Sequence, residues 1–185
     1  MPNIMVVLDA CVLFPASLRD TLLRALEHRL YSAYWTREIL EEVRRNLVST
    51  QKMGEQQAQR LIEALLNAFP EAIVTDYQQY ISAMMNHPKD RHVLAATVAA
   101  QATVLLTFNV RDFPPVALSP LNITAQLPDD FLLKLDSDYP GIMPTIILEQ
   151  AKNLSRPAMT PAESLTILHI HVPKFVHRMR EVLQL

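Results

Sequence analysis

The strongest constraint on the fold comes from two short, mostly apolar runs, each followed by a polar residue. The first run, Ile4 to Leu8, ends at Asp9, and the second, Thr103 to Phe108, ends at Asn109. Runs of strand length without an alternating polar face are typical of strands that are buried on both sides, as in a parallel sheet. The sequence therefore predicts an α/β fold with a central, mostly parallel sheet.

Helical patterns separate the expected strands. Thr36 is expected to cap a helix whose apolar stripe is Ile39, Leu40, Val43 and Leu47. An alanine-rich helix begins near Asp90 and runs into the second strand. The remaining expected elements are a helix capped by Ser17, helices over 54–69 and 77–86, and short strands over 31–35, 72–75 and 121–125. Strands that alternate with helices predict an α/β architecture.

The composition changes near residue 127, which predicts a boundary there. Residues 129–150 carry more acidic than basic side chains, and residues 151–185 show the reverse. The tail is expected to be helical, with one helix capped by Thr160 and Glu163 and another beginning at Pro173. We therefore expect a first domain over 1–126 and a C-terminal helical appendage over 127–185.

Several functions are excluded by composition. The 185 residues include two glycines, too few for a glycine-rich dinucleotide or P-loop motif, and one cysteine, which excludes a disulfide framework. The net charge of −2 implies that any surface for nucleic acid is local. The N-terminus lacks the pattern of a signal peptide, so we expect a cytoplasmic protein without a membrane segment. The apolar stretch 93–110 is expected to be a helix followed by a strand.

Acidic residues follow the ends of the two buried runs. Because the carboxyl ends of parallel strands meet at one edge, Asp9, Asn109 and Asp112 are expected to converge there, and Asp90 can reach the same edge. Carboxylates held close together repel one another unless a cation compensates their charge. Mg²⁺ or Mn²⁺ prefers oxygen ligands, and such a site is suited to metal-assisted phosphodiester hydrolysis.

Three glutamates on the Thr36 helix are candidates for a position beside this edge of the sheet. At about 100° per residue, Glu42 lies about 115° from the centre of the apolar stripe, compared with about 145° for Glu41 and about 155° for Glu38. Glu42 is therefore the glutamate expected to reach the site past the core.

Four sequence blocks, taken in order, resemble the PIN-domain ribonucleases and most closely the VapC-type toxins. They are VVLDACVL at Asp9, ILEEVRRNL at Glu42, PKDRHVLAA at Asp90 and LTFNVRDFP at Asp112. The resemblance covers residues 1–126, and the tail resembles an extension found in one subgroup of these toxins. It implies a three-layer α/β/α fold and cleavage of RNA that leaves 5′-phosphate and 3′-hydroxyl ends. It also implies a homodimer that is neutralised by a small, DNA-binding antitoxin.

The resemblance also implies roles for individual residues. The catalytic quartet would be Asp9, Glu42, Asp90 and Asp112, of which Asp9, Asp90 and Asp112 would bind Mg²⁺ or Mn²⁺. Many relatives have aspartate where Asn109 stands, so either Asn109 or Asp112 is the one nearer the metal. Thr107 and Asn109 would be polar neighbours of the metal. The basic residues considered as RNA contacts are Lys89, Arg91, Arg111 and Arg19.

Other interpretations of the same residues remain open. Asp9 and Asp112 are also typical turn residues, Asp90 is a typical helix cap, and Glu42 is also typical of a solvated helix face. The alternative functions are a catalytically inactive PIN-like scaffold, a DNA-directed flap-type nuclease, and a receiver domain phosphorylated on Asp9.

Overall fold

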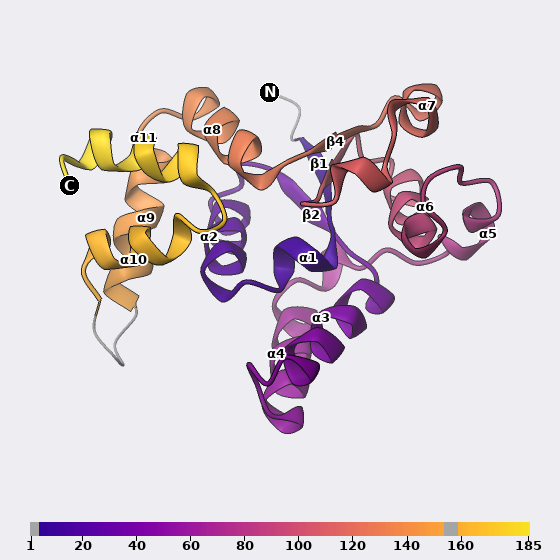
Figure 1. Cartoon of the computed structure of the whole chain (residues 1–185), viewed down its shortest axis with the longest axis horizontal. Helices are drawn as coiled ribbons and strands as arrows, with labels where there is room; N and C mark the ends of the chain where they lie inside the picture. Colours follow the sequence, from indigo (N-terminus) through magenta and orange to yellow (C-terminus); the bar gives the residue numbers. More distant parts are fainter. Residues whose placement is uncertain (1–3, 154–158) are drawn as a thin grey trace. The chain divides into compact units, whose positions relative to one another are not determined.

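The computed structural model describes residues 4–153 and 159–185 (Figure 1). The chain divides into two compact units, each described here by itself. The first contains Met1–Phe14 and Tyr31–Gln126, and the second contains Pro15–Leu30 and Leu127–Leu185. The second unit thus includes a segment from the N-terminal part of the sequence as well as the C-terminal region.

A parallel sheet forms the centre of the first unit. Its four strands are β1 (Met5–Leu8), β2 (Ser32–Tyr34), β3 (Val104–Leu106) and β4 (Thr124–Gln126), in the order β2-β1-β3-β4 (Figure 1). In the middle of the sheet, Leu8 pairs with Leu106, and neither side chain is exposed. The predicted parallel sheet is confirmed. Because β1 and β3 end at the same level, the residues that follow them emerge side by side.

Helices cover this sheet in the expected three-layer α/β/α arrangement, and α6 packs directly against β1 and β3. The α-helices of the first unit are α1 (Ala10–Leu13), α3 (Arg37–Ser49), α4 (Glu55–Ala68), α5 (Gln78–Ile81), α6 (Arg91–Ala99) and α7 (Pro115–Leu118). Its short 3₁₀ helices are η1 (Pro70–Ala72), η2 (Pro88–Asp90), η3 (Val110–Asp112) and η4 (Ser119–Leu121).

Helix α3 forms where its cap and its apolar stripe predict it. The hydroxyl oxygen of Thr36 accepts a hydrogen bond from the backbone N–H of Ile39 at 3.1 Å, which satisfies one of the free donors at the start of the helix. The four stripe residues are buried. Because this stripe fixes the rotation of α3, Glu42 is held at the border between core and solvent, with 29% of its side chain exposed.

Two expected elements are shorter in the structure. The expected strand over 72–75 is reduced to one bridge between Trp35 and Ile73, because this segment lies beyond the end of β2 and finds only Trp35 to pair with. The expected helix over 77–86 is limited to α5. Its residues are all outside the core, and a short helix without a buried face gains little from extension.

The second unit consists of five helices among the described residues. They are α2 (Ala16–Glu27), α8 (Pro128–Asp138), α9 (Ile142–Asn153), α10 (Pro161–Leu168) and α11 (Pro173–Leu183). The predicted cap of α10 is confirmed, since Thr160 and Glu163 form a reciprocal capping box. The expected cap at Ser17 is wrong, because α2 begins at Ala16, with Pro15 in the cap position.

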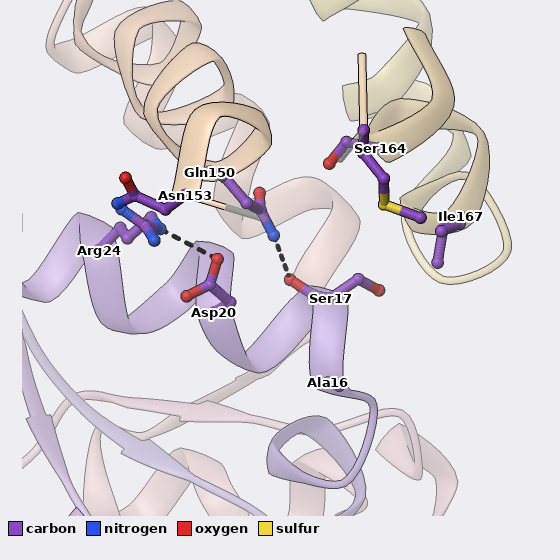
Figure 2. A pocket seen from close by; sticks show the side chains of 9 residues that line it. Ala16, Ser17, Asp20, Arg24, Gln150, Asn153, Ser164 and Ile167 are labelled. Carbon is purple, nitrogen blue, oxygen red and sulfur yellow. Dashed lines mark hydrogen bonds and ion pairs between the residues drawn. The ribbon is translucent and has the colours of Figure 1, made fainter. Parts of the chain in front are cut away.

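Helix α2 joins the second unit through packing against α9 and α10. Figure 2 shows the amide of Gln150, on α9, donating to the backbone carbonyl of Ser17 at 3.0 Å. The hydroxyl of Thr21 donates to the same Gln150 side chain, also at 3.0 Å. The residues of Figure 2 line a cavity of about 450 Å³. One division between the two compact units falls after Gln126, and residues 15–30 group with the C-terminal helices.

Among the described residues, none of the helices combines the length and the apolar character that spanning a membrane requires.

Candidate metal centre and active site

Asp9 is the first residue after β1 and is almost completely buried, with 5% exposure. Its Oδ2 atom accepts a hydrogen bond from the Thr107 hydroxyl at 2.6 Å and one from the Cys11 thiol at 3.1 Å. Its backbone N–H donates to the carbonyl of Leu106 at 3.1 Å. Both side-chain hydrogen bonds go to the same carboxylate oxygen, so they fix the orientation of Asp9 while leaving Oδ1 for another ligand.

Cys11 acts here as a hydrogen-bond donor. Burial, together with the charge of Asp9, raises the pKa of its thiol to about 12. The group therefore remains protonated at neutral pH and is a poor nucleophile. Its sulfur accepts a hydrogen bond from the N–H of Phe108 at 3.2 Å, which ties the start of α1 to the segment after β3.

Asp9 and Asp90 both occupy the N-cap position of a helix, Asp9 for α1 and Asp90 for α6. Within the described part of the chain, neither side chain makes the hydrogen bond of a helix cap. Burial raises the pKa of Asp90, and the negative charges of Asp9 and Asp112 raise it further. The structure thus brings three carboxylates into electrostatic contact instead of using two of them as caps.

Asp112 and His87 complete a compact group around Asp90. One ligand atom from each of His87, Asp90 and Asp112 lies within 4.8 Å of the other two. The N–H of His87 donates to the carbonyl of Asp112 at 3.1 Å, and the N–H of Asp90 donates to the carbonyl of His87 at 2.9 Å. The first of these hydrogen bonds joins the N-cap of η2 to η3, although the two segments are separated by α6 and β3.

Asn109 contributes mainly through its backbone. Its N–H donates to the hydroxyl oxygen of Thr107 at 3.0 Å, and its carbonyl accepts from the N–H of Asp112 at 2.9 Å. Its side chain is exposed. The structure therefore places Asp112 in the carboxylate group, while Asn109 shapes the turn that carries Asp112.

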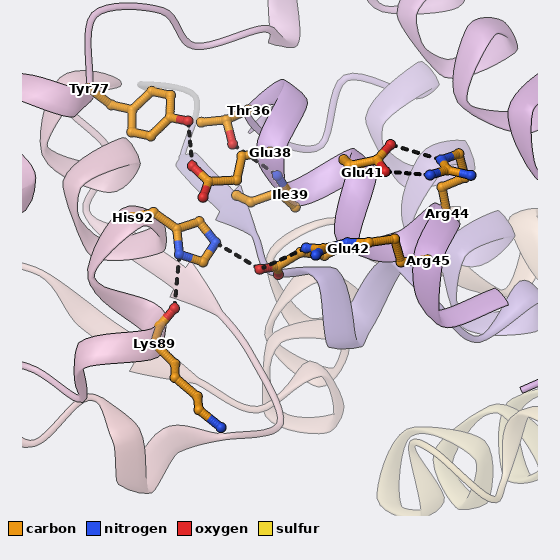
Figure 3. A network of polar contacts seen from close by, with 10 residues as sticks. All are labelled: Thr36, Glu38, Ile39, Glu41, Glu42, Arg44, Arg45, Tyr77, Lys89 and His92. Atoms are coloured by element: carbon orange, nitrogen blue, oxygen red, sulfur yellow. Dashed lines mark hydrogen bonds and ion pairs between the residues drawn. The ribbon is translucent and has the colours of Figure 1, made fainter. Parts of the chain in front are cut away.

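Glu42 is connected to α6 through His92, which is 7% exposed (Figure 3). Atom Nδ1 of His92 donates to the carbonyl of Lys89 at 3.0 Å, and Nε2 lies 3.4 Å from Oε1 of Glu42, an ion-pair distance without hydrogen-bond geometry. Burial lowers the pKa of His92, but the carboxylates of Glu42 and Glu38 outweigh it, so the pKa lies above the usual histidine value. His92, which is two residues after Asp90 in the sequence, thus holds Glu42 at an ion-pair distance.

The other two glutamates of α3 face different partners (Figure 3). Glu38 accepts a hydrogen bond from the Tyr77 hydroxyl at 2.6 Å, and Glu41 pairs with Arg44 on the solvent side. Of the three glutamates, Glu42 is the one whose carboxylate faces His92 on α6.

The donor set suits a hard divalent cation. Asp9, Asp90 and Asp112 supply carboxylate oxygens from three different elements. Burial raises the pKa of Asp90, and the charges of Asp9 and Asp112 add repulsion that raises it further. A bound cation removes that repulsion, and Mg²⁺ or Mn²⁺ prefers such ligands. The residues present therefore fit a metal of this class.

Comparison with known families agrees with this geometry. A family model described as "PIN domain" matches residues 5–111, which is more than half of the chain. The chain belongs to the PIN-domain family. A second model, described as "VapC50 C-terminal domain", matches residues 128–181. The chain is also 40% identical, over 116 residues, to the Mycobacterium tuberculosis protein named "Putative ribonuclease VapC50", a match that covers 63% of this chain and 69% of that protein. No solved structure matches the chain.

These matches make the chain a VapC-type PIN protein with a C-terminal extension, which places it among the nuclease hydrolases. The PIN-domain match includes Asp9, Glu42 and Asp90 and ends one residue before Asp112. The second match falls on α8 to α11. The resemblance to this family seen in the sequence is therefore confirmed.

The basic candidates differ in their surroundings. Lys89 and Arg111 are exposed and lie in the same short helices as Asp90 and Asp112. Arg91 is partly buried, and its Nε donates to the carbonyl of Asn86 at 3.5 Å. Arg19 is 7% exposed within α2 of the second unit. A side chain with so little exposed surface is a poor contact for a phosphate, so we omit Arg19 from the RNA contacts proposed below.

Sequence analysis missed the roles of two histidines, His87 and His92. Both flank Asp90 in the stretch HPKDRH, so their spacing around a candidate ligand was the available signal. The lone cysteine also has a specific contact in the structure, since the Cys11 thiol donates a hydrogen bond to Asp9.

Proposed function

We propose that the protein is a metal-dependent endoribonuclease and the toxin of a toxin–antitoxin module. The observation that carries this proposal is the acidic group of a VapC-type PIN protein, in which Asp90 and Asp112 lie within reach of one cation and the charge of Asp9 acts on Asp90. Neither Asp9 nor Asp90 is used as a helix cap in the described structure, which leaves both free to bind a cation. The proposed cofactor is Mg²⁺, or Mn²⁺.

Each residue has a distinct proposed part in the reaction. Asp9, oriented by Thr107 and Cys11, would hold the metal together with Asp90 and Asp112. Glu42, held by His92, would orient the attacking water at the border of the site. The metal would activate water and stabilise the leaving oxygen of the phosphodiester. Thr107 would act on Asp9, and the backbone of Asn109 would support Thr107.

RNA would approach over the exposed side chains of Lys89 and Arg111, with Arg91 two residues after Lys89. Contacts with phosphates supply affinity without reading sequence. The proposed partners also include a small antitoxin that binds DNA through its other half, and a second copy of this chain in a homodimer. We place this activity in the cytoplasm. The VapC-type sequence, with its C-terminal domain, supports these assignments.

The direct test is cleavage of total cellular RNA by the purified protein with Mn²⁺, Mg²⁺ or EDTA. The Asp9→Asn variant, prepared in parallel, controls for contaminating nuclease. Discrete fragments that require metal and disappear in the variant are the expected result, and mapping their ends tests for 5′-phosphates. A flap DNA substrate in the same assay distinguishes a DNA-directed enzyme. Cleavage of neither substrate would favour the inactive scaffold.

The biological role requires a separate experiment. The chain is expressed alone and together with the small open reading frame next to its gene. Growth arrest by the chain alone, relieved by co-expression, is expected for a toxin with its antitoxin. Normal growth at a verified expression level would contradict the toxin assignment, even if cleavage is observed in vitro.

A further inference from the structure

We propose that His87 is a metal ligand through Nδ1, and that the site therefore selects Mn²⁺ over Mg²⁺. This inference rests on the proposed function, since it concerns the metal at the same site. It goes further because it adds a nitrogen ligand to a site that the sequence describes by its carboxylates alone.

The distances between ligand atoms carry the proposal. Nδ1 of His87 lies 3.5 Å from Oδ2 of Asp90, and the group of His87, Asp90 and Asp112 spans at most 4.8 Å between any two ligand atoms. Adjacent ligands of an octahedral ion with bonds of about 2.1 Å are roughly 3 Å apart, and opposite ligands are about 4.2 Å apart. Shifts of a few tenths of an ångström in side chains at the protein surface would bring all three atoms to one ion.

Backbone hydrogen bonds fix the position of the His87 main chain. Its N–H donates to Asp112 at 3.1 Å, and its carbonyl accepts from Asp90 at 2.9 Å, so His87 is joined to both other members of the group. Pro88 follows directly and favours an extended conformation at His87, which has ψ of 131°. The backbone therefore holds the imidazole of His87 near both carboxylates. Its side chain is 48% exposed, so the ring can still rotate towards a metal ion.

The chemistry of the ligand decides the metal preference. Imidazole nitrogen is a favourable ligand for transition metals, whereas Mg²⁺ favours oxygen and gives up water reluctantly. A site with one imidazole and several carboxylates therefore gains affinity for Mn²⁺ relative to Mg²⁺. Replacing His87 with a residue that offers oxygen should reduce this difference.

A simple surface ion pair is the alternative role for His87. The chain offers a matched example in His177, whose Nε2 lies 3.3 Å from Oε1 of Glu181 on α11. Among the described residues, His177 belongs to no group of three or more side chains that could bind a metal. If His87 were only an ion-pair partner of Asp90, its replacement would leave the choice of metal unchanged, as replacement of His177 should.

The test measures binding of Mn²⁺ alone and Mg²⁺ alone to the full chain by calorimetry, without RNA. The variants are His87→Asn, His87→Gln, the control His177→Asn, and Asp90→Asn. We expect both His87 variants to lower the ratio of Mn²⁺ to Mg²⁺ affinity about tenfold, which corresponds to about 1.4 kcal/mol. We expect the control to retain the wild-type ratio. Circular dichroism verifies that each variant is folded.

Electron spin-echo spectroscopy of Mn²⁺ bound to the unmodified protein gives a second measurement that needs no variant to fold. A nitrogen coupling that disappears in the His87 variants would support the ligand. An unchanged affinity ratio, or no nitrogen coupling in the wild type, would overturn the inference. Mn²⁺ binding that depends on Asp90 but is unaffected by His87 overturns this inference alone. If neither metal binds to the wild type, the proposed function fails as well.

Discussion

The hydroxyl of Thr107 donates a 2.6 Å hydrogen bond to Oδ2 of Asp9, a residue 98 positions earlier in the chain. Both residues directly follow central strands that end at the same level of the sheet. Because the register of β1 and β3 fixes the position of Thr107 relative to Asp9, this hydrogen bond fixes the orientation of the Asp9 carboxylate. Through this hydrogen bond, Thr107 can act on the proposed metal site without contacting a substrate itself.

Replacing Thr107 with valine should reduce metal affinity about 10- to 100-fold, the range observed when a partner of a metal ligand is lost. Valine removes the donor to Asp9 and the acceptor for the N–H of Asn109. Thr107→Ser retains the hydroxyl and should bind metal much as the wild type does. Metal titrations followed by thermal stability measure both variants. Equal affinities for the valine and serine variants would exclude this role for the hydrogen bond.

The two ring nitrogens of His92 can be tested separately. Asparagine places an amide near the position of Nδ1 and keeps the donor to Lys89, whereas glutamine places one near Nε2 and keeps the contact with Glu42. If Glu42 acts through its orientation, His92→Asn should lower the rate of RNA cleavage at saturating RNA more than His92→Gln does, by about tenfold.

A double-mutant cycle provides the control for this prediction. In a Glu42→Gln background, the His92→Asn change should have little further effect, because the two residues would act as one unit. Full additivity of the two substitutions would mean that His92 acts independently of Glu42.

The Asp90→Asn variant should be more stable than the wild type without metal and less stable than the wild type with metal. Without metal, the variant should be the more stable, since it removes a charge that burial, Asp9 and Asp112 all disfavour. With metal at a hundred times its dissociation constant, the wild type should gain about 2.7 kcal/mol that the variant lacks. Thermal unfolding in EDTA and in Mn²⁺ measures both states. A variant that is less stable than the wild type in EDTA would argue against repulsion among these carboxylates.

Lys89→Ala and Arg111→Ala should each weaken RNA binding by a similar amount for all RNA sequences. Each removes an exposed cation beside a proposed metal ligand, and the loss of one phosphate contact should reduce the slope of log affinity against log salt by about 1. Binding is measured on catalytically inactive Asp9→Asn protein at several salt concentrations. Arg60→Ala on the outer face of α4 is the control. A salt slope that equals the control's would remove that residue from the RNA surface.

The capping box of α10 should make this helix sensitive to acid. Hydrogen bonds from the backbone and hydroxyl of Thr160 lower the pKa of Glu163 from its usual 4.5. The stabilisation is therefore complete above about pH 4.5 and is lost as the pH falls through the lower, folded-state pKa. Hydrogen exchange of residues 161–168, corrected for intrinsic rates, should show falling protection in that range. Glu163→Gln should lose this pH dependence, and Thr160→Ala should cost about 1 kcal/mol.

Local patterns in the sequence predicted the parts of the site that depend on local geometry. Asp9 follows from the apolar run before it, and Glu42 follows from the rotation of α3 around its buried stripe. Of the two helix caps expected from the sequence, one is correct and one is wrong. Thr160 has a helix that begins at the next residue, whereas Ser17 lies inside a helix that begins at Ala16.

The contacts that sequence analysis missed depend on packing between distant segments. His87 reaches its position through a backbone hydrogen bond to Asp112, and His92 meets Glu42 across two helices. Neither contact leaves a pattern in neighbouring residues. The amphipathic pattern of α2 likewise predicts a buried face without indicating which elements bury it.

The membership of α2 in the second unit has a consequence for synthesis on the ribosome. Residues 15–30 emerge between β1 and β2, but α9 and α10, against which α2 packs, are translated more than a hundred residues later. Until then, α2, whose buried residues include Leu18 and Leu22, lacks the two helices against which it packs in the finished protein. A nascent chain that has completed β4 would therefore carry an unsatisfied apolar helix between its first two strands, and a deletion after residue 126 would make that state permanent.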